Sequence, residues 1–87
     1  MKIKKGFILR KVGGQNVVVA VGGASRSFNG IIRLNDSGKY LWEKLQKDIS
    51  EKELLAAMLS DFDIDENTAE ADISAFIGKL EEAGLLE

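Results

Sequence analysis

The sequence predicts an α+β domain in which a three-stranded antiparallel sheet is followed by three helices. Before residue 35 the apolar stretches are short, rich in β-branched residues and separated by glycine pairs, as in strands joined by turns. After residue 35 the apolar residues recur at spacings of three and four, which is the period of amphipathic helices. A chain of 87 residues has room for one compact unit. We therefore expect a single domain over residues 1–87, with a β-meander over 1–35 and a three-helix part over 36–87.

Glycine-rich segments separate the three expected strands. The strands cover residues 7–12, 17–21 and 28–34. Residues 13–16, with the sequence Gly-Gly-Gln-Asn, have the composition of a tight hairpin turn, because glycine and asparagine tolerate the positive φ angles that such turns require. Residues 22–25 make a second and looser connection. The strands are therefore expected to pair in sequence order as an antiparallel meander.

Capping signals mark the start of each expected helix. Asn35, Asp36 and Ser37 are all good N-cap residues for the first helix, and Ser50 with Glu53 forms a capping box for the second. The third helix is expected to begin near Asp65 and to end at Gly84. The apolar sides of the three helices consist of Leu41, Trp42, Leu45 and Ile49, then Leu54, Leu55, Met58, Leu59 and Phe62, then Ala69, Ile73, Phe76, Ile77, Leu80 and Ala83. A small sheet ahead of three such helices gives a winged helix-turn-helix-like arrangement with its sheet placed first.

The composition excludes most catalytic and metal chemistry. The chain has no histidine and no cysteine, which removes thiolate nucleophiles, Cys/His zinc sites, haem ligands and the Ser-His-Asp triad. Asp61, Asp63, Asp65 and Asp72 echo a calcium-binding loop, but Glu66 occupies the position where that loop needs glycine. We therefore expect no enzyme activity, no metal site and no cofactor.

The N-terminus indicates the compartment. No apolar run approaches the roughly 20 residues that span a bilayer. The basic residues at the start lead into a strand-like alternation instead of the apolar block of a signal peptide. The sequence thus predicts a cytoplasmic protein with no membrane partner.

Charge divides the chain at the same boundary as the periodicity. Residues 1–35 hold seven Lys and Arg and no acid, whereas residues 36–87 hold five Lys and all 14 acids. The winged-helix shape leaves DNA binding or transcription regulation open as an alternative function. The third helix, which would enter the major groove, is however acidic, with Lys79 as its single base. We therefore do not expect nucleic acid to be the partner.

Two segments resemble the PqqD-like family. Residues 28–45 combine a strand that ends in Leu34-Asn35, a short polar turn and a helix with a Leu41-Trp42 pair, which is similar to the central signature of that family. The ending from Leu80 to the Gly-Leu-Leu of residues 84–86 is similar to its C-terminal pattern. The resemblance covers nearly the whole chain.

This resemblance implies a role in peptide recognition. PqqD-like domains are recognition elements that bind the leader segment of a ribosomally synthesised precursor peptide and deliver it to a modifying enzyme, such as a radical S-adenosylmethionine (SAM) protein. In the family the leader adds as an extra strand beside the third strand, in a groove shared with the third helix. The expected partners are therefore a precursor peptide and a modifying enzyme, and we expect no cofactor.

The residues themselves are compatible with such strand addition. A sheet edge exposes unpaired N–H and C=O groups, which an added peptide strand satisfies while its alternate side chains enter pockets. Arg26 and Arg33 flank the third strand with positive charge, which suits an acidic leader. Ile31 and Ile77 are the positions that we expect to touch both core and groove. The candidate peptide-binding residues are Ser27, Phe28, Asn29, Gly30, Ile31, Ile32, Arg33 and Leu34 on the strand, and Ile73, Phe76, Ile77 and Leu80 on the helix.

Overall fold

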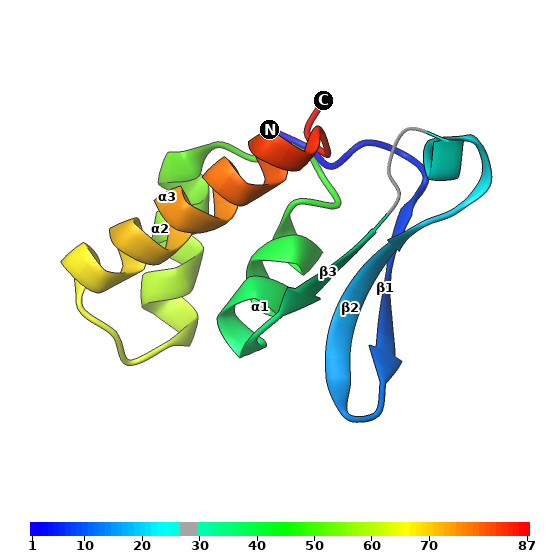
Figure 1. The fold of residues 1–87 in the computed structure, drawn as a ribbon. Helices are drawn as coiled ribbons and strands as arrows, with labels where there is room; N and C mark the ends of the chain where they lie inside the picture. Colours follow the sequence, from blue (N-terminus) through cyan, green and yellow to red (C-terminus); the bar gives the residue numbers. More distant parts are fainter. Residues whose placement is uncertain (27–29) are drawn as a thin grey trace.

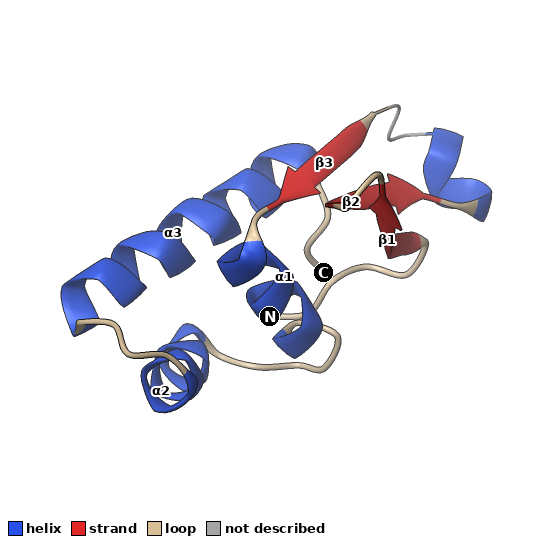
Figure 2. Ribbon diagram, turned by 90° about the horizontal axis from the view of Figure 1, so that it is seen from below, coloured by secondary structure: helices blue, strands red, loops and turns tan. Residues whose placement is uncertain are grey.

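The computed structural model describes residues 1–26 and 30–87 and has the predicted α+β fold (Figure 1). A three-stranded antiparallel sheet of order β1-β2-β3 precedes three helices. Figure 2 shows the helices on one side of the sheet. The elements are, in chain order, β1 (Phe7–Val12), β2 (Gln15–Ala20), the short 3-10 helix η1 (Gly22–Arg26), β3 (Ile31–Leu34), α1 (Asp36–Lys44), α2 (Glu51–Asp61) and α3 (Glu66–Ala83).

The turn between β1 and β2 is shorter than expected. Gly13 and Gly14 have φ angles of 56° and 79°, which are the positive values of two-residue hairpin turns that match the sheet twist. Gln15 and Asn16 were expected in the turn, and this expectation was wrong. Both residues belong to β2, because two glycines suffice to reverse the chain and the ladder begins directly after them.

The second connection and the third strand also differ from the expectation. Residues 22–26 form η1 instead of a loose turn, and Val21 lies just beyond β2, where its N–H donates to the carbonyl of Gly6 at 2.8 Å. β3 begins at Ile31, and Gly30 is a bend before it. Residues 28 and 29, which were expected at the start of this strand, lie outside the described residues.

The predicted caps define the helix boundaries. Asn35 and Asp65 each accept a hydrogen bond from the backbone N–H three residues further on, and Ser50 with Glu53 forms the complete capping box. Gly84 ends α3 in the left-handed conformation, with φ of 74°. The side chains of Asn35, Ser50 and Asp65 satisfy N–H groups that have no partner inside a helix, and this fixes where each helix starts.

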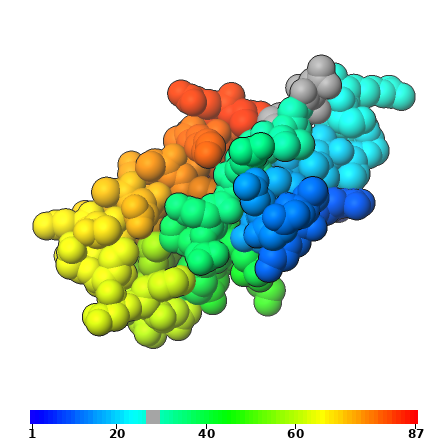
Figure 3. Space-filling model, turned by 60° about the horizontal axis from the view of Figure 1, so that its bottom comes forward, coloured from blue at the N-terminus to red at the C-terminus, as the bar shows by residue number. Residues whose placement is uncertain are grey.

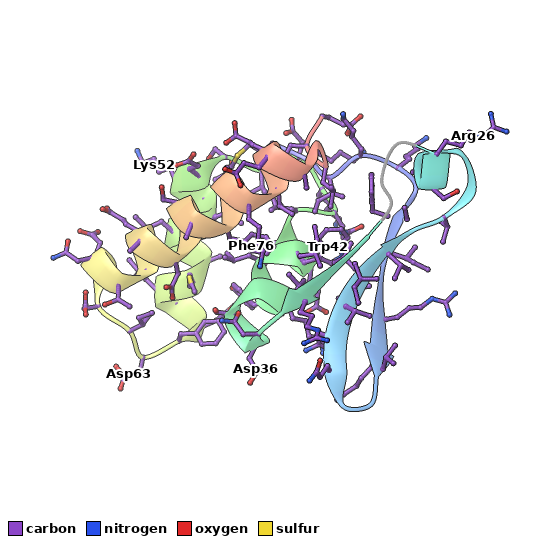
Figure 4. All side chains as sticks on the ribbon, viewed as in Figure 1. Arg26, Asp36, Trp42, Lys52, Asp63 and Phe76 are labelled. Carbon is purple, nitrogen blue, oxygen red and sulfur yellow. The ribbon has the colours of Figure 1, made fainter. Side chains whose placement is uncertain are left out.

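One cluster of buried side chains lies between the inner face of the sheet and the three helices. Val18 of β2 and Ile32 of β3 contribute from the sheet. Trp42 is 3% exposed and belongs to this core, as expected. Figure 4 shows Trp42 and Phe76 within the layer between sheet and helices. Ile49 is partly buried but lies beyond the end of α1, so the expectation that it extends that helix was wrong.

The two ends of the chain pair with each other beside the C-terminal end of α3 (Figure 1). Ile3 is buried and forms an isolated antiparallel bridge with Leu86. The N–H of Lys4 donates to the carbonyl of Leu85 at 2.8 Å, which holds the last apolar residues against the core. In the described residues no helix has the length and apolar character needed to cross a membrane.

Candidate functional site

The hairpin register determines which backbone groups of the sheet face outward at its edge. Val12 and Gln15 flank a two-residue turn, so they exchange both of their backbone hydrogen bonds. Backbone groups alternate in direction along a strand, and those of Asn16 and Val18 therefore point away from β1 and toward β3. This alternation fixes the pattern on β3 as well.

β3 has one side free, and two of its residues present their backbone groups there. Leu34 and Ile32 stand opposite Asn16 and Val18 in the register, so their N–H and C=O groups are used within the sheet. The groups of Ile31 and Arg33 consequently point to the open side. Among the described residues, none outside the sheet bonds to them. Such an edge is a template for pairing with another chain.

A hollow of about 340 Å³ lies between β3, the start of α1 and α3. We call it the groove. Figure 3 shows α3 in orange adjoining β3 and α1 in green along one side of the molecule. Its lining consists of Arg33 and Leu34 from β3, Asn35, Ser37, Gly38 and Leu41 from α1 and its cap, and Asp72, Ala75, Phe76 and Lys79 from α3. The four α3 residues share one helix face, because they are spaced by three, four and seven.

The groove has an apolar floor and a charged rim. Leu34, Leu41 and Phe76 are buried side chains, and Phe76 is 8% exposed. Arg33 and Lys79 are exposed at the rim. An apolar floor inside a polar rim is the usual construction of a binding site, since the floor provides affinity and the rim provides orientation.

Gly38 allows the groove wall to close tightly at its α1 end. A Cβ atom at this position would lie 3.1 Å from Oδ1 of Asn35 and 3.5 Å from Cε1 of Phe76. The Asn35 oxygen accepts hydrogen bonds from the Gly38 N–H at 2.8 Å and from the Ser37 hydroxyl at 3.1 Å. The cap that starts α1 therefore also fixes the wall against which the Phe76 ring lies.

The candidate residues of the strand divide by face and by position. Ile31 and Arg33 are exposed, with Ile31 at 57%, whereas Ile32 and Leu34 are buried. Gly30 is exposed ahead of the strand. Residues 27–29, which are Ser27, Phe28 and Asn29, lie outside the described residues. Of the described strand candidates, Arg33 and Leu34 line the groove.

On α3 the structure brings only Phe76 of the candidate residues to the groove. Ile73, Ile77 and Leu80 are buried members of the core cluster. Ile77 borders a different hollow beside the chain termini. Their contact with a peptide stays a prediction.

Three groove residues of α3, which are Asp72, Ala75 and Lys79, were not among the predicted peptide-binding residues. The available signal was their helical spacing around Phe76, at four before, one before and three after it. The predicted residues follow the apolar stripe of α3 instead, and that stripe faces the core. The groove uses the neighbouring face, where a small side chain and two charged ones leave space above Phe76.

Two of the four acidic residues that echoed a calcium loop, Asp61 and Asp65, have local structural partners. Asp65 caps α3, and the backbone and hydroxyl of Thr68 bonded to it hold the pKa of Asp65 below its usual value. Asp61 accepts a hydrogen bond from the Tyr40 hydroxyl, and burial together with this carboxylate raises the pKa of Tyr40 to about 12. Within residues 1–26 and 30–87 no group of three acidic side chains is arranged to hold a metal ion.

Comparison with known proteins identifies relatives of the same fold. One solved structure, described as TbiB1 in complex with the TbiA(beta) leader peptide, is 22% identical, with a TM-score of 0.76, and the match covers 100% of this chain and 95% of that one. Another, described as lasso peptide synthetase B1 complexed with the leader peptide, is 19% identical, with a TM-score of 0.72 and coverage of 97% and 93%. No curated protein matches the chain. Residues 15–86 match the family model described as coenzyme PQQ synthesis protein D, and the chain therefore belongs to the PqqD family.

Proposed function

We propose that this protein is a non-catalytic peptide chaperone, which binds the leader segment of a ribosomally synthesised precursor peptide as a fourth strand beside β3 and presents it to a modifying enzyme such as a radical SAM protein. The observation that carries the proposal is the free edge of β3 beside an apolar-floored groove. Membership of the PqqD family supports it, and so do two relatives of the same fold that are described with leader peptides.

The backbone of the peptide would pair with Ile31 and Arg33. Their N–H and C=O groups face the open side, so a strand placed there gains main-chain hydrogen bonds whatever its sequence. The side chains of that strand alternate between the two faces of the sheet. Those on the inner face enter the groove over Leu34, Leu41 and Phe76, and these contacts select apolar side chains at every second position.

The charge around the groove favours an acidic leader. Arg33 and Lys79 stand at its rim, β1 and η1 add further basic residues, and none of the three strands contains an acid. Opposite charge raises the rate of encounter and orients the peptide before the strand pairs. The half-buried Asp72 lies on the same helix face and gives the groove one position that prefers a basic side chain.

The alternative of DNA binding has no supporting observation. The outer side of α3 carries Glu66, Glu70 and Glu81 as exposed residues. A duplex would meet these carboxylates if α3 entered its major groove, and phosphates repel them. The peptide groove lies at the junction of α3 and β3 and does not require that approach.

A groove-filling variant tests the proposal. Ala75→Trp places a large ring over the groove from an exposed position, and Ala56→Trp on α2 makes the same change at an exposed position away from it. The probes are synthetic N-terminal segments of the short reading frames that adjoin the gene of this chain, titrated by calorimetry. We expect one segment to bind wild-type protein and Ala56→Trp equally, and Ala75→Trp at least about tenfold more weakly, a loss of about 1.4 kcal/mol. Equal binding by all three proteins would place the peptide elsewhere.

A further inference from the structure

The side of the sheet that faces away from the helices carries apolar side chains that do not belong to the core. Strand alternation puts Leu9, Val18 and Ile32 on the inner face, and all three contact or form the core cluster. Their neighbours Ile8 and Val19 point to the opposite face, and neither packs against that cluster. We call this opposite side the outer face.

The register arranges the outer face in two rows across the strands. One row is apolar and joins Ile8, Val19 and Ile31. The other joins Arg10 and Arg33 across Val17. The outer face thus includes Ile8, Arg10, Val17, Val19, Ile31 and Arg33, with Val12 at its hairpin end.

The burial of Val17 indicates that the two arginines beside it lie against the sheet. Its side chain is 6% exposed, yet it is absent from the core cluster. Its cross-strand neighbours on this face are Arg10 and Arg33. The aliphatic stems of arginines cover apolar surface of this kind while the guanidinium groups stay in water. Neither arginine has an ion-pair partner among the described residues, so both charges are available to another molecule.

The charge around this apolar row selects the occupant. Residues 1–35 contain no acid, and Lys11 and Arg26 add to the positive charge near the sheet. Ile31 is 57% exposed and Val12, at the hairpin end of the same face, is 59% exposed. An apolar centre with arginines beside it matches the composition of protein interfaces, where aromatic and apolar residues and Arg are enriched. A complementary partner has apolar residues opposite Ile8 and Val19, with carboxylates around them.

A second copy of this chain does not fit the outer face. Packing two outer faces against each other would set arginines against arginines, which is repulsive. Packing the outer face against the acidic α3 of another copy would be a head-to-tail contact that leaves an equivalent face open on each molecule, so it does not close into a dimer. Nucleic acid would place its phosphates against the apolar row of Ile8, Val19 and Ile31, and apolar side chains contribute no affinity for phosphate groups.

We propose that the outer face is a docking surface for an acidic globular protein, which shares only Arg33 with the groove that takes the peptide. The two surfaces lie on either side of β3, and the docking surface extends over β2 to β1 at the far edge of the sheet. A peptide in the groove and a protein on the outer face can therefore be held at the same time. This inference does not depend on peptide binding, because Ile8, Arg10 and Val19 belong to strands that do not line the groove.

Charge reversal at matched positions of β1 tests the docking surface. Arg10→Glu changes the outer face, and Lys11→Glu makes the same kind of change at the next residue, which is also exposed but points to the other side of the strand. The probes are the proteins encoded by the reading frames that adjoin the gene, purified singly and measured for binding by interferometry. We expect one of them to bind, Arg10→Glu to weaken it at least about tenfold, Lys11→Glu to change it less than about threefold, and added salt to weaken the wild-type complex. Both variants should keep the wild-type helical spectrum and melting temperature.

Four results would overturn the inference. The first is that none of these proteins binds, and the second is that Arg10→Glu and Lys11→Glu weaken binding equally, which indicates attraction to overall charge. The third is self-association of the wild-type chain in sedimentation, or binding of duplex DNA at about 150 mM salt, that Arg10→Glu abolishes. The fourth is a loss of peptide affinity in Arg10→Glu that is as large as its loss of protein binding, because the outer face and the groove would then not act independently. Retained peptide affinity with lost protein binding supports the docking surface, whereas loss of peptide binding in Ala75→Trp alone bears only on the groove.

Discussion

Replacing Arg33 by proline separates backbone pairing from side-chain contact at the edge of the sheet. The N–H of Arg33 faces the open side, so proline at this position leaves the ladder between β2 and β3 complete. The residue before it, Ile32, is already extended within β3, which is the conformation that a following proline prefers. We therefore expect Arg33→Pro to fold normally and to lose one donor for the added strand.

The magnitude follows from what the peptide loses. A peptide carbonyl that is placed against the edge without a donor costs about 1 to 3 kcal/mol. At about 1.4 kcal/mol for each tenfold change, the dissociation constant should rise by about fivefold to 150-fold. Arg33→Ala keeps the N–H and removes one exposed charge, so it should weaken binding by only about 0.5 to 1 kcal/mol.

Calorimetric titration of both variants with the bound leader segment measures the difference. Circular dichroism and urea unfolding must first show that Arg33→Pro keeps wild-type helix content and stability. Ile32→Pro is the matched control, because its N–H bonds to β2, and that change should destabilise the sheet itself. Equal affinities of folded Arg33→Pro and Arg33→Ala for the peptide would refute pairing at this edge.

Three further predictions concern the scaffold. Gly6→Ala should lower the unfolding free energy by about 1 to 3 kcal/mol, because φ is 96° and the new Cβ would lie 2.7 Å from that of Ala24. Gly78→Ala in α3, where a new Cβ has nothing within 4 Å, should raise the unfolding free energy by about 0.5 to 1 kcal/mol. Urea unfolding followed by the fluorescence of Trp42, the single tryptophan, measures both variants, and similar effects of the two changes would contradict the backbone argument. Tyr40, the single tyrosine, should ionise at about pH 12 when titrated by ultraviolet absorbance, and Asp61→Asn should bring the pKa of Tyr40 down toward 10. Because the pKa of Tyr40 is raised in the folded state, the stability of the protein should fall as the pH rises from 10 to 12. An unchanged titration midpoint of Tyr40 in Asp61→Asn would show that Asp61 has no part in raising the pKa. Asp65→Ala should lower the melting temperature at neutral pH, because it removes the cap of α3. The pKa of Asp65 is lowered in the folded state, so the difference in melting temperature between wild type and variant should be present above pH 3.8 and fade as the pH falls through the folded pKa. A difference that persists in stronger acid would mean that the cap does not depend on the charge of Asp65.

The local signals in the sequence predicted the fold because each acts over a few residues. The capping residues Asn35, Ser50 and Asp65 start the helices where expected, and Gly84 ends the last one. The turn was misjudged because the sequence does not distinguish a two-residue turn from a four-residue one when both contain glycine and asparagine. That error moved the start of β2 by two residues but kept its inward and outward faces, since the side-chain period of a strand is two.

The site was less predictable because it depends on contacts between distant segments. The edge position of β3 followed from the meander, but the groove face of α3 did not follow from hydrophobicity. Phe76 lies at the boundary between core and groove, and the residues beside it in the groove are small or charged. Gly38 illustrates the same limit, since glycine is needed there because of the close approach of the Phe76 ring, which lies 38 positions later in the chain. Only the packed structure shows that these residues meet.

In the proposed complex, an extended peptide pairs with β3 and fills the groove. Titration of isotope-labelled protein with the bound leader segment, followed by amide chemical shifts and by contacts between peptide and protein protons, measures this most directly. We predict the largest shifts within residues 27–34 and along the α3 face that carries Asp72, Phe76 and Lys79, together with cross-strand contacts to Ile31 and Arg33. Shifts confined to residues 2–10 or to α2, without cross-strand contacts to β3, would contradict it.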